Sequence, residues 1–114
     1  MLTVYGIKTC DTVKKALKWL EAEGIAHTFH DFRADGLERA EVQRWVDALG
    51  WESVLNRRST TWRELSDDDK NGIDAAKAVV LMCGHPTLIK RPVFVGNDLI
   101  LNGFTDDVRA RLSA

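Results

Sequence analysis

The chain has 114 residues, of which 45% are hydrophobic and 29% are charged, and its formal net charge is -1. This length and composition suffice for one compact domain with a core that needs no disulfide or metal. The near-neutral charge argues against a nucleic-acid binder that works through bulk positive charge. No apolar run approaches the roughly 18 residues of a membrane span, and the N-terminus has the pattern of a strand rather than a signal peptide. We therefore expect a cytoplasmic monomer without a membrane or nucleic-acid partner.

The first half of the sequence alternates between strand and helix patterns. The β-prone segment Leu2–Ile7 predicts a buried strand. In Asp11–Glu23, apolar residues recur at i, i+3, i+4 and i+7, which predicts an amphipathic helix closed by Gly24. Ile25–Phe32 alternates loosely and favours a second strand, and Leu37–Leu49 has the spacing of a second helix.

The middle of the sequence is less regular. Residues 51–69 contain short helical turns without a long period. The segment Ala75–Cys83 returns to helical spacing, and its predicted core-facing stripe consists of Ala76, Val79, Val80 and Cys83. On this reading Cys83 is a core residue.

The C-terminal part of the sequence resembles a hairpin followed by a helix. Pro92–Val95 and Leu99–Leu101 are short strand patterns, and Thr105 is a suitable cap for a last helix. The element order is thus β-α-β-α, a helical insert of roughly residues 37–84, and β-β-α. Without the insert, this is the order of a thioredoxin-like domain, which belongs to the α/β class and has a mixed central sheet with helices on both faces. We expect one such domain over residues 1–114.

Cys10 stands where the first strand pattern gives way to the first helix pattern. It could be a buried filler, a metal ligand or a nucleophile. Unpaired N–H groups and the helix dipole would stabilise a thiolate at this place, and the thiolate is the reactive form. Lys8 adds positive charge, whereas Asp11 opposes it. The polar neighbours Thr9 and Thr12 fit an apolar core poorly, so the pattern favours a reactive thiol.

The sequence offers Cys10 no partner thiol nearby. The third residue after it is Val13, so a C-x-x-C motif is absent, and the other cysteine, Cys83, is far away in the sequence. In a reducing cytosol we expect no disulfide between the two cysteines. An oxidised Cys10 would need an outside thiol, for which glutathione is the natural candidate. No grouping of histidines and cysteines has zinc spacing, so we expect no metal site.

Two arginine motifs are further candidates for the site. Arg57 and Arg58 are adjacent in LNRRSTTWREL. Such a pair could be a solvated surface, or a guanidinium aimed at the thiolate could lower its pKa or hold an oxyanion or carboxylate. Arg91 and Pro92 precede a strand pattern, where the proline could mark an edge strand or a cis bond.

Three segments in the same order resemble the arsenate reductase-like family. GIKTCDTVKKAL is similar to the active-site loop of that family, LNRRSTTWREL to its mid-chain arginine segment, and MCGHPTLIKRPVFVGNDLILNGF to its C-terminal part. The family includes glutaredoxin-coupled arsenate reductases, Spx-type transcription regulators and YffB-type proteins, and the sequence is most similar to the YffB-type branch. The resemblance implies a thioredoxin-like fold with a helical insert, Cys10 as the nucleophile and Pro92 as a cis proline beside it.

The resemblance also implies which arginines face the nucleophile. Arsenate reductases of this family surround the catalytic cysteine with three arginines. Arg91 matches one of them, and Arg57 or Arg58 matches the second, with a slight preference for Arg58. The third has no counterpart, because the hairpin ends in Leu101–Phe104.

Within the family, the sequence best fits a glutathione-dependent thiol/disulfide reductase. Glutathione would be a co-substrate rather than a bound cofactor, and glutaredoxin is a further candidate partner. The residues expected to contact the substrate or glutathione are Lys8, Thr9, Thr12, Arg57, Arg58, Arg91 and Pro92. The alternatives are an Spx-like regulator that binds RNA polymerase, although such regulators usually carry C-x-x-C here, and an arsenate reductase.

Overall fold

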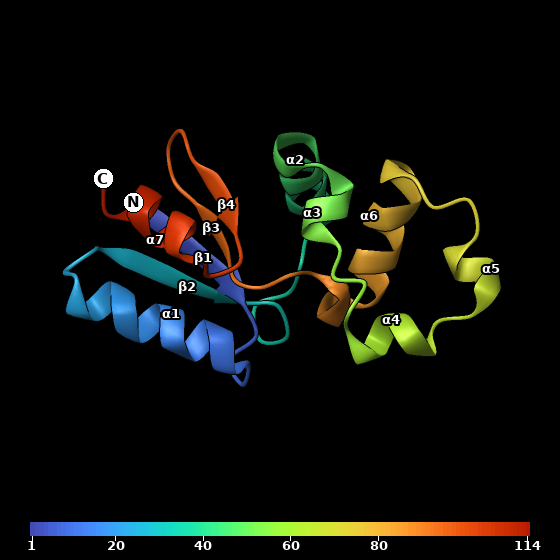
Figure 1. The fold of residues 1–114 in the computed structure, drawn as a ribbon, viewed down its shortest axis with the longest axis horizontal. Helices are drawn as coiled ribbons and strands as arrows, with labels where there is room; N and C mark the ends of the chain where they lie inside the picture. The colour runs from blue at the N-terminus through green and yellow to red at the C-terminus, as the bar shows by residue number, and fades with distance from the viewer. The chain divides into compact units, whose positions relative to one another are not determined.

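The computed structural model describes residues 1–114, which form two compact units. The first, the sheet unit, consists of Met1–Gly36 and Arg91–Ala114, and the second, the helical unit, of Leu37–Lys90. The sheet unit contains β1 (Leu2–Gly6), α1 (Asp11–Ala22), β2 (His27–Asp31), β3 (Val93–Val95), β4 (Ile100–Asn102) and α7 (Asp106–Leu112) (Figure 1). The helical unit contains α2 (Arg39–Leu49), α3 (Trp51–Val54), α4 (Thr60–Glu64), α5 (Asp67–Lys70), α6 (Ala75–Gly84) and the 3-10 helix η1 (Pro86–Leu88). None of these helices combines the length and the apolar character needed to cross a membrane.

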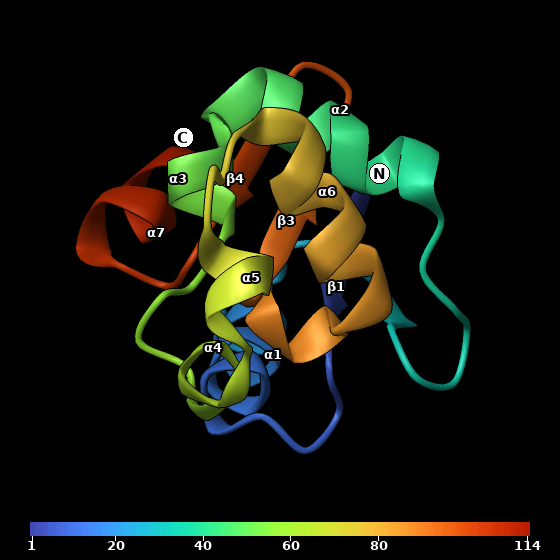
Figure 2. The same cartoon turned by 90° about the vertical axis from the view of Figure 1, so that its right-hand side faces the viewer.

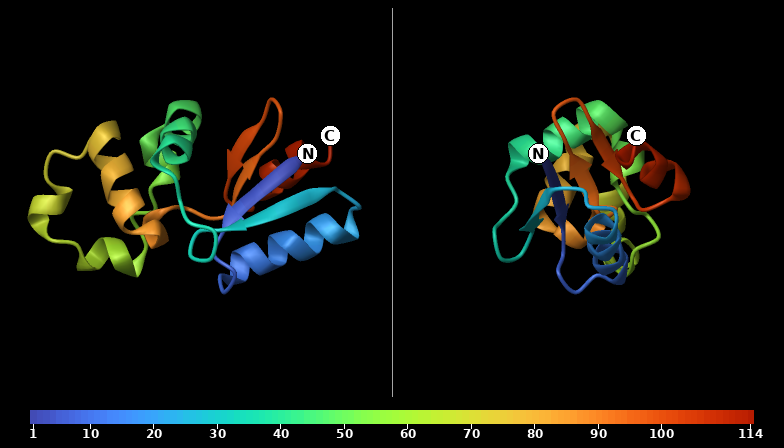
Figure 3. Two further views of the ribbon diagram at one scale, coloured as in Figure 1. Left: turned by 180° about the vertical axis from the view of Figure 1, so that it is seen from behind. Right: turned by 90° about the vertical axis from the view of Figure 1, so that its left-hand side faces the viewer.

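The sheet has the strand order β2-β1-β3-β4. The helix α1 returns the chain so that β1 and β2 are parallel, whereas β3 pairs antiparallel with both β1 and β4. Figure 3 shows α1 running beside β2 under this sheet. A mixed sheet with this order of helices and strands confirms the predicted α/β class and thioredoxin-like fold.

The core of the sheet unit lies between one face of the sheet and two helices. Leu2 and Val4 alternate with outward-facing residues and so point to the same side of β1. They pack with Phe94 and with side chains of α1 and α7 in a cluster completed by Ala16, Leu20, Leu101 and Val108. The stripe predicted for the first helix is thus confirmed as its packing face. The predicted cap is also confirmed, since the Val108 N–H donates to the Thr105 hydroxyl.

The core of the helical unit forms where α2, α3 and α6 meet (Figure 2). The helix α6 buries Ala78, Val79, Leu81 and Met82. The stripe predicted for this helix is therefore wrong in register, because Val80 is 53% exposed and Cys83 is only half-buried. The segment AAKAVVLMCG is apolar almost all round, so a stripe one residue earlier has the same helical spacing. The insert predicted at residues 37–84 falls within this unit, and that the chain is one domain stays a prediction.

Candidate active site

Cys10 lies between the end of β1 and the start of α1. Its N–H donates to the Ile7 carbonyl over 3.0 Å, which closes a tight turn after the strand. Its own carbonyl accepts the Lys14 N–H over 3.0 Å, which is the first hydrogen bond of a 12-residue helix. Cys10 is therefore the N-cap residue of α1, with its sulfur at the end of the helix where N–H groups lack intrahelical acceptors.

The surroundings of Cys10 favour its thiolate form. Burial alone would raise the pKa of the thiol, but the backbone N–H of Val13, the side chain of Arg91 and the backbone N–H of Thr12 outweigh it and lower the pKa below its ordinary value. The sulfur makes no capping hydrogen bond in the observed position, so these N–H groups act on the charge rather than through a fixed cap. A lowered pKa raises the thiolate fraction at neutral pH, as is typical of reactive cysteines at helix N-termini.

Arg91 supplies the positive charge of the site, and two of its hydrogen-bond donor atoms have no partner. The Arg91–Pro92 peptide bond is cis, as the family resemblance predicted. The Pro92 carbonyl accepts the Gly103 N–H over 2.9 Å, which ties this segment to the chain after β4. The Nε and Nη1 atoms of Arg91 are buried and have no hydrogen-bond partner. Because buried donors are normally satisfied, an anionic oxygen beside Cys10 would complete this arginine.

Asp31, at the end of β2, fastens the loop that carries Cys10. One carboxylate oxygen accepts the Lys8 N–H over 2.9 Å, and the other accepts the N–H groups of Arg33 and Ala34 over 2.7 and 3.1 Å. Burial alone would raise the pKa of Asp31, but these N–H groups lower it below its ordinary value. This role of Asp31 was not predicted from the sequence, because Asp31 is separated from Lys8 by 23 positions and no local sequence pattern indicates their contact.

A close approach of α1 to β1 sets the position of the helix N-terminus. A Cβ atom on Gly6 would lie 2.7 Å from Cγ2 of Val13, a distance that real Cβ atoms essentially never show. The glycine therefore lets the fully buried Val13 rest directly on the strand. This contact is three residues from Cys10 and holds the first turn of α1 against the sheet.

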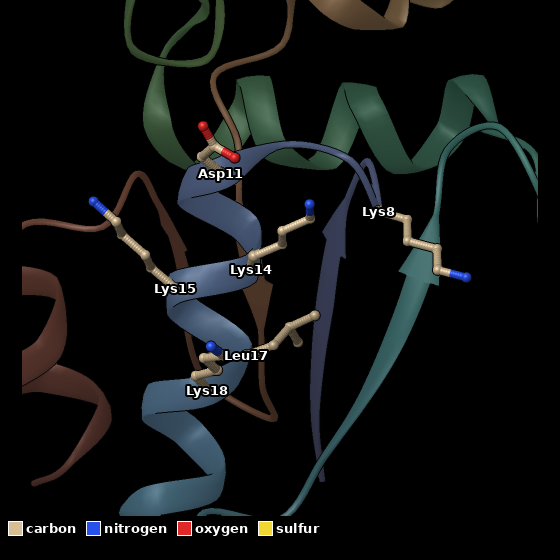
Figure 4. A pocket seen from close by; sticks show the side chains of 6 residues that line it. All are labelled: Lys8, Asp11, Lys14, Lys15, Leu17 and Lys18. Atoms are coloured by element: carbon tan, nitrogen blue, oxygen red, sulfur yellow. The ribbon is translucent and has the colours of Figure 1, made fainter.

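The other residues expected at the site lie in both units. Lys8, Thr9 and Thr12 are exposed around the first turn of α1. Figure 4 shows the Lys8 side chain directed away from α1, and Lys8 is not among the groups that lower the pKa of Cys10. The charge that we expected from Lys8 at the thiolate therefore comes from Arg91.

Arg57 and Arg58 belong to the helical unit and are both exposed. The Arg57 guanidinium lies 3.7 Å from a carboxylate oxygen of Glu52 and 5.6 Å from the centre of the Trp51 ring. The Arg58 backbone N–H donates to Asn56, whereas its guanidinium forms no ion pair. Which of Arg57 and Arg58 belongs to the site, with the slight preference for Arg58, stays a prediction.

Cys83 differs from Cys10 in its electrostatic surroundings. Burial raises the pKa of its thiol, and the charge of Arg39 opposes this only in part. Cys83 is in the last turn of α6, at the opposite end from the N-terminus of that helix. Of the two free cysteines, only Cys10 has surroundings that lower the pKa of its thiol.

Comparison with known proteins finds a family model, individual sequences and solved structures that each match most of this chain. The model of the ArsC family matches residues 5–111. An uncharacterised protein of Haemophilus influenzae is 47% identical over 93% of both chains, and the global transcriptional regulator Spx of Streptococcus mutans is 26% identical over 98% of this chain and 83% of its own. A solved structure of a YffB protein is 44% identical, covers all of both chains and superposes with a TM-score of 0.95. The chain belongs to the ArsC family.

Proposed function

We propose that the protein is a glutathione-dependent thiol/disulfide reductase that works as a monomer in the reducing cytoplasm and uses Cys10 as its single nucleophile. The observation that carries this proposal is the lowered pKa of Cys10, which results from the N–H groups of α1 and the side chain of Arg91. A lowered pKa increases the fraction of the nucleophilic thiolate at Cys10, whereas the pKa of Cys83 is raised. The absence of a second cysteine at Val13 means that glutathione completes the exchange.

The reaction proceeds in two exchanges. The Cys10 thiolate attacks one sulfur of a substrate disulfide, a new bond forms between Cys10 and that sulfur, and the other substrate sulfur leaves as a thiolate that takes up a proton. Glutathione thiolate then attacks the mixed disulfide and releases Cys10. If the first substrate is a protein–glutathione disulfide, the second exchange gives oxidised glutathione.

Some of the expected binding residues would contact the two carboxylates of glutathione, and others would contact its peptide backbone. The free Nε and Nη1 atoms of Arg91 are suited to a carboxylate oxygen. Lys8, Thr9 and Thr12 are exposed near Cys10 in the sheet unit, whereas the role expected of Arg57 or Arg58, in the helical unit, rests on the family resemblance alone. The segment at Pro92 would pair with the peptide backbone, as an extended peptide pairs with the edge of a sheet.

Mass spectrometry after incubation with oxidised glutathione tests this proposal. We expect one glutathione on Cys10 and none on Cys83, and we expect that reduced glutathione removes the adduct. A Cys10→Ser variant should take up no glutathione. Equal labelling of both cysteines, or an adduct that persists in the Cys10→Ser variant, would contradict the proposal that Cys10 is the single nucleophile.

Arsenate reduction is a second candidate, and the two unpartnered buried donors of Arg91 favour it. Arsenate bound there would lie beside the Cys10 thiolate, which would attack the arsenic atom and displace one oxygen as hydroxide. Glutathione thiolate would then attack the Cys10 sulfur, so that arsenite leaves with the electron pair and Cys10 is left as a mixed disulfide with glutathione. The third arginine of the family pattern is replaced by the segment Leu101–Phe104, which removes one charge partner of the oxyanion. The test is arsenate turnover with glutathione and glutaredoxin. A rate no greater than that of Cys10→Ser excludes this activity.

Transcription regulation is favoured by the likeness to Spx. A pull-down with purified RNA polymerase discriminates between this role and catalysis. Stoichiometric binding that survives Cys10→Ser would support a regulator and displace catalysis as the main role. Absence of binding at equimolar protein would leave the two catalytic candidates, thiol/disulfide exchange and arsenate reduction.

A further inference from the structure

The lysines of the sheet unit gather at one place. Four of the seven lysines in the sequence are in this unit, and all four line a single pocket of about 510 Å³. Figure 4 shows three of them projecting from α1 and the fourth from the loop after β1. The pocket lining consists of Lys8, Asp11, Lys14, Lys15, Leu17 and Lys18. Its volume is within the range of small-molecule binding sites.

The charges of this pocket are not neutralised within the protein. Lys14, Lys15 and Lys18 follow Asp11 at i+3, i+4 and i+7, so they share the face of α1 opposite its core-facing side. All four lysines are exposed, and the ion pairs of the structure involve only arginines. Even without Lys8, whose side chain is directed away from α1, the three lysines of α1 outnumber the one carboxylate of Asp11, in a chain with a net charge of -1. The pocket is therefore a local site for anions.

We propose that this lysine pocket binds the carboxylates of the small anionic thiol or disulfide that exchanges with Cys10. The proposal rests on the reductase function proposed above. Asp11 lines the pocket and directly follows Cys10 in the chain, so a molecule held along the first turns of α1 can extend its sulfur toward the nucleophile. Glutathione carries two carboxylates and one ammonium group and is therefore an anion overall, and the lysines of the pocket offer cations for its carboxylates.

The pocket acts on the exchange only through binding. The Cys10 thiolate attacks a sulfur of glutathione disulfide, the bond between the two glutathione sulfurs breaks, and the departing glutathione thiolate takes up a proton. Both the disulfide and the departing thiolate keep their carboxylates. The lysines therefore raise the local concentration of an anionic disulfide and leave that of a neutral disulfide unchanged.

The ratio of two rate constants isolates this effect. In each variant, the rate of mixed-disulfide formation at Cys10 is measured with glutathione disulfide and with the neutral bis(2-hydroxyethyl) disulfide. Dividing the first rate by the second removes any change in the thiolate fraction of Cys10. In Lys14→Gln/Lys18→Gln we expect the ratio to fall roughly fivefold at low ionic strength, since exposed charge pairs have modest strength. The wild-type ratio should also fall as salt shortens the Debye length to about 8 Å at 0.15 M.

Two further variants complete this experiment. Arg33→Gln/Arg111→Gln removes the same number of exposed positive charges from the sheet unit outside the pocket, and should keep the wild-type ratio. Asp11→Asn removes the one negative charge of the pocket, so its ratio should rise. An equal fall in the arginine variant would reduce the effect to net charge and overturn the proposal. An unchanged ratio in the lysine variant would overturn it as well.

A binding measurement separates failure of the pocket from failure of the reductase. S-methylglutathione cannot exchange disulfides but keeps both carboxylates, and its binding can be followed by amide chemical shifts. We expect shifts along the first two turns of α1 that are lost in Lys14→Gln/Lys18→Gln. Such shifts without any Cys10 adduct from glutathione disulfide would support the pocket and refute the reductase. A Cys10 adduct without shifts on α1 would support the reductase and refute the binding of glutathione in the pocket. An acidic protein surface would then be the remaining candidate ligand of these lysines.

Discussion

Replacement of Asp31 by asparagine should destabilise the protein and loosen the loop of Cys10. Asp31 is 8% exposed, and its two carboxylate oxygens accept three backbone N–H groups. Asparagine keeps one oxygen for Arg33 and Ala34 but presents an NH₂ group to the Lys8 N–H, where a donor then faces a donor. A hydrogen bond to a charged group contributes about 1.5–3 kcal/mol, and an unsatisfied donor costs about 1–3 kcal/mol. We expect Asp31→Asn to lower the free energy of unfolding by about 2–4 kcal/mol.

Urea unfolding measures this loss, and amide hydrogen exchange locates it. The Lys8 and Cys10 amides should exchange faster in Asp31→Asn, because the hydrogen bond from the Lys8 N–H to the Asp31 carboxylate is missing. The control is Asp35→Asn, in which the amide oxygen can still accept the Asp31 N–H that now donates to Asp35 over 3.0 Å. This exposed position should change stability by less than about 1 kcal/mol. If Asp31→Asn were as stable as Asp35→Asn, the hydrogen bonds of the Asp31 carboxylate would not stabilise the loop that carries Cys10.

The dependence on pH provides a second check on Asp31. The folded-state pKa of Asp31 is lowered, so its ionised carboxylate stabilises the folded protein above the unfolded-state pKa of about 3.9. This contribution is lost as the pH falls through the lower, folded-state pKa. The stability difference between wild type and Asp31→Asn should therefore be constant near neutral pH and shrink in acid. A difference that grows in acid would contradict the assigned direction of the shift.

Two further changes test the surroundings of the nucleophile, and a third tests the cap of α7. Arg91→Gln removes a group that lowers the pKa of Cys10, so the midpoint of its iodoacetamide reactivity against pH should move up; an unmoved midpoint would contradict this role. Gly6→Ala should cost about 1–3 kcal/mol in urea unfolding, because the new methyl collides with Val13. Adding Val13→Ala should recover part of this cost, and strict additivity would argue against the contact. Thr105→Ala should cost about 1 kcal/mol and lower the melting temperature through loss of the α7 cap, whereas Thr105→Ser should stay close to wild type.

Periodic patterns predicted the helices well where apolar and polar residues alternate clearly. The helix α1 buries Val13, Ala16 and Leu20, as its spacing indicated, since the opposite face carries lysines. In α6 nearly every residue is apolar, so the pattern could identify the helix but not the side that it buries. The packing of a hydrophobic helix is decided by its neighbours, which the local sequence does not contain.

The candidate site was predictable in part for a similar reason. Cys10 could be recognised locally, because a strand, a cysteine and a helix follow one another in the sequence. The place of Arg91 beside it came from the family resemblance, and Asp31 was missed because its partner Lys8 is remote in sequence. The lysines of α1 had a readable signal in the spacing of Lys14 and Lys18 with Asp11, but the pocket that gives this spacing a meaning requires the fold.

The packing of Val13 bears on how the thiol exchange ends. Position 13 is where the second cysteine of a C-x-x-C motif would stand, and here it is a fully buried β-branched side chain resting on Gly6. A cysteine there would lose a methyl group from a tight contact and point its thiol into the core rather than to solvent. The same contact that fixes the first turn of α1 thus commits position 13 to structure. In the exchange that we propose, the resolving thiol would then come from solution, and the lysine pocket that starts at Asp11 would select it by charge.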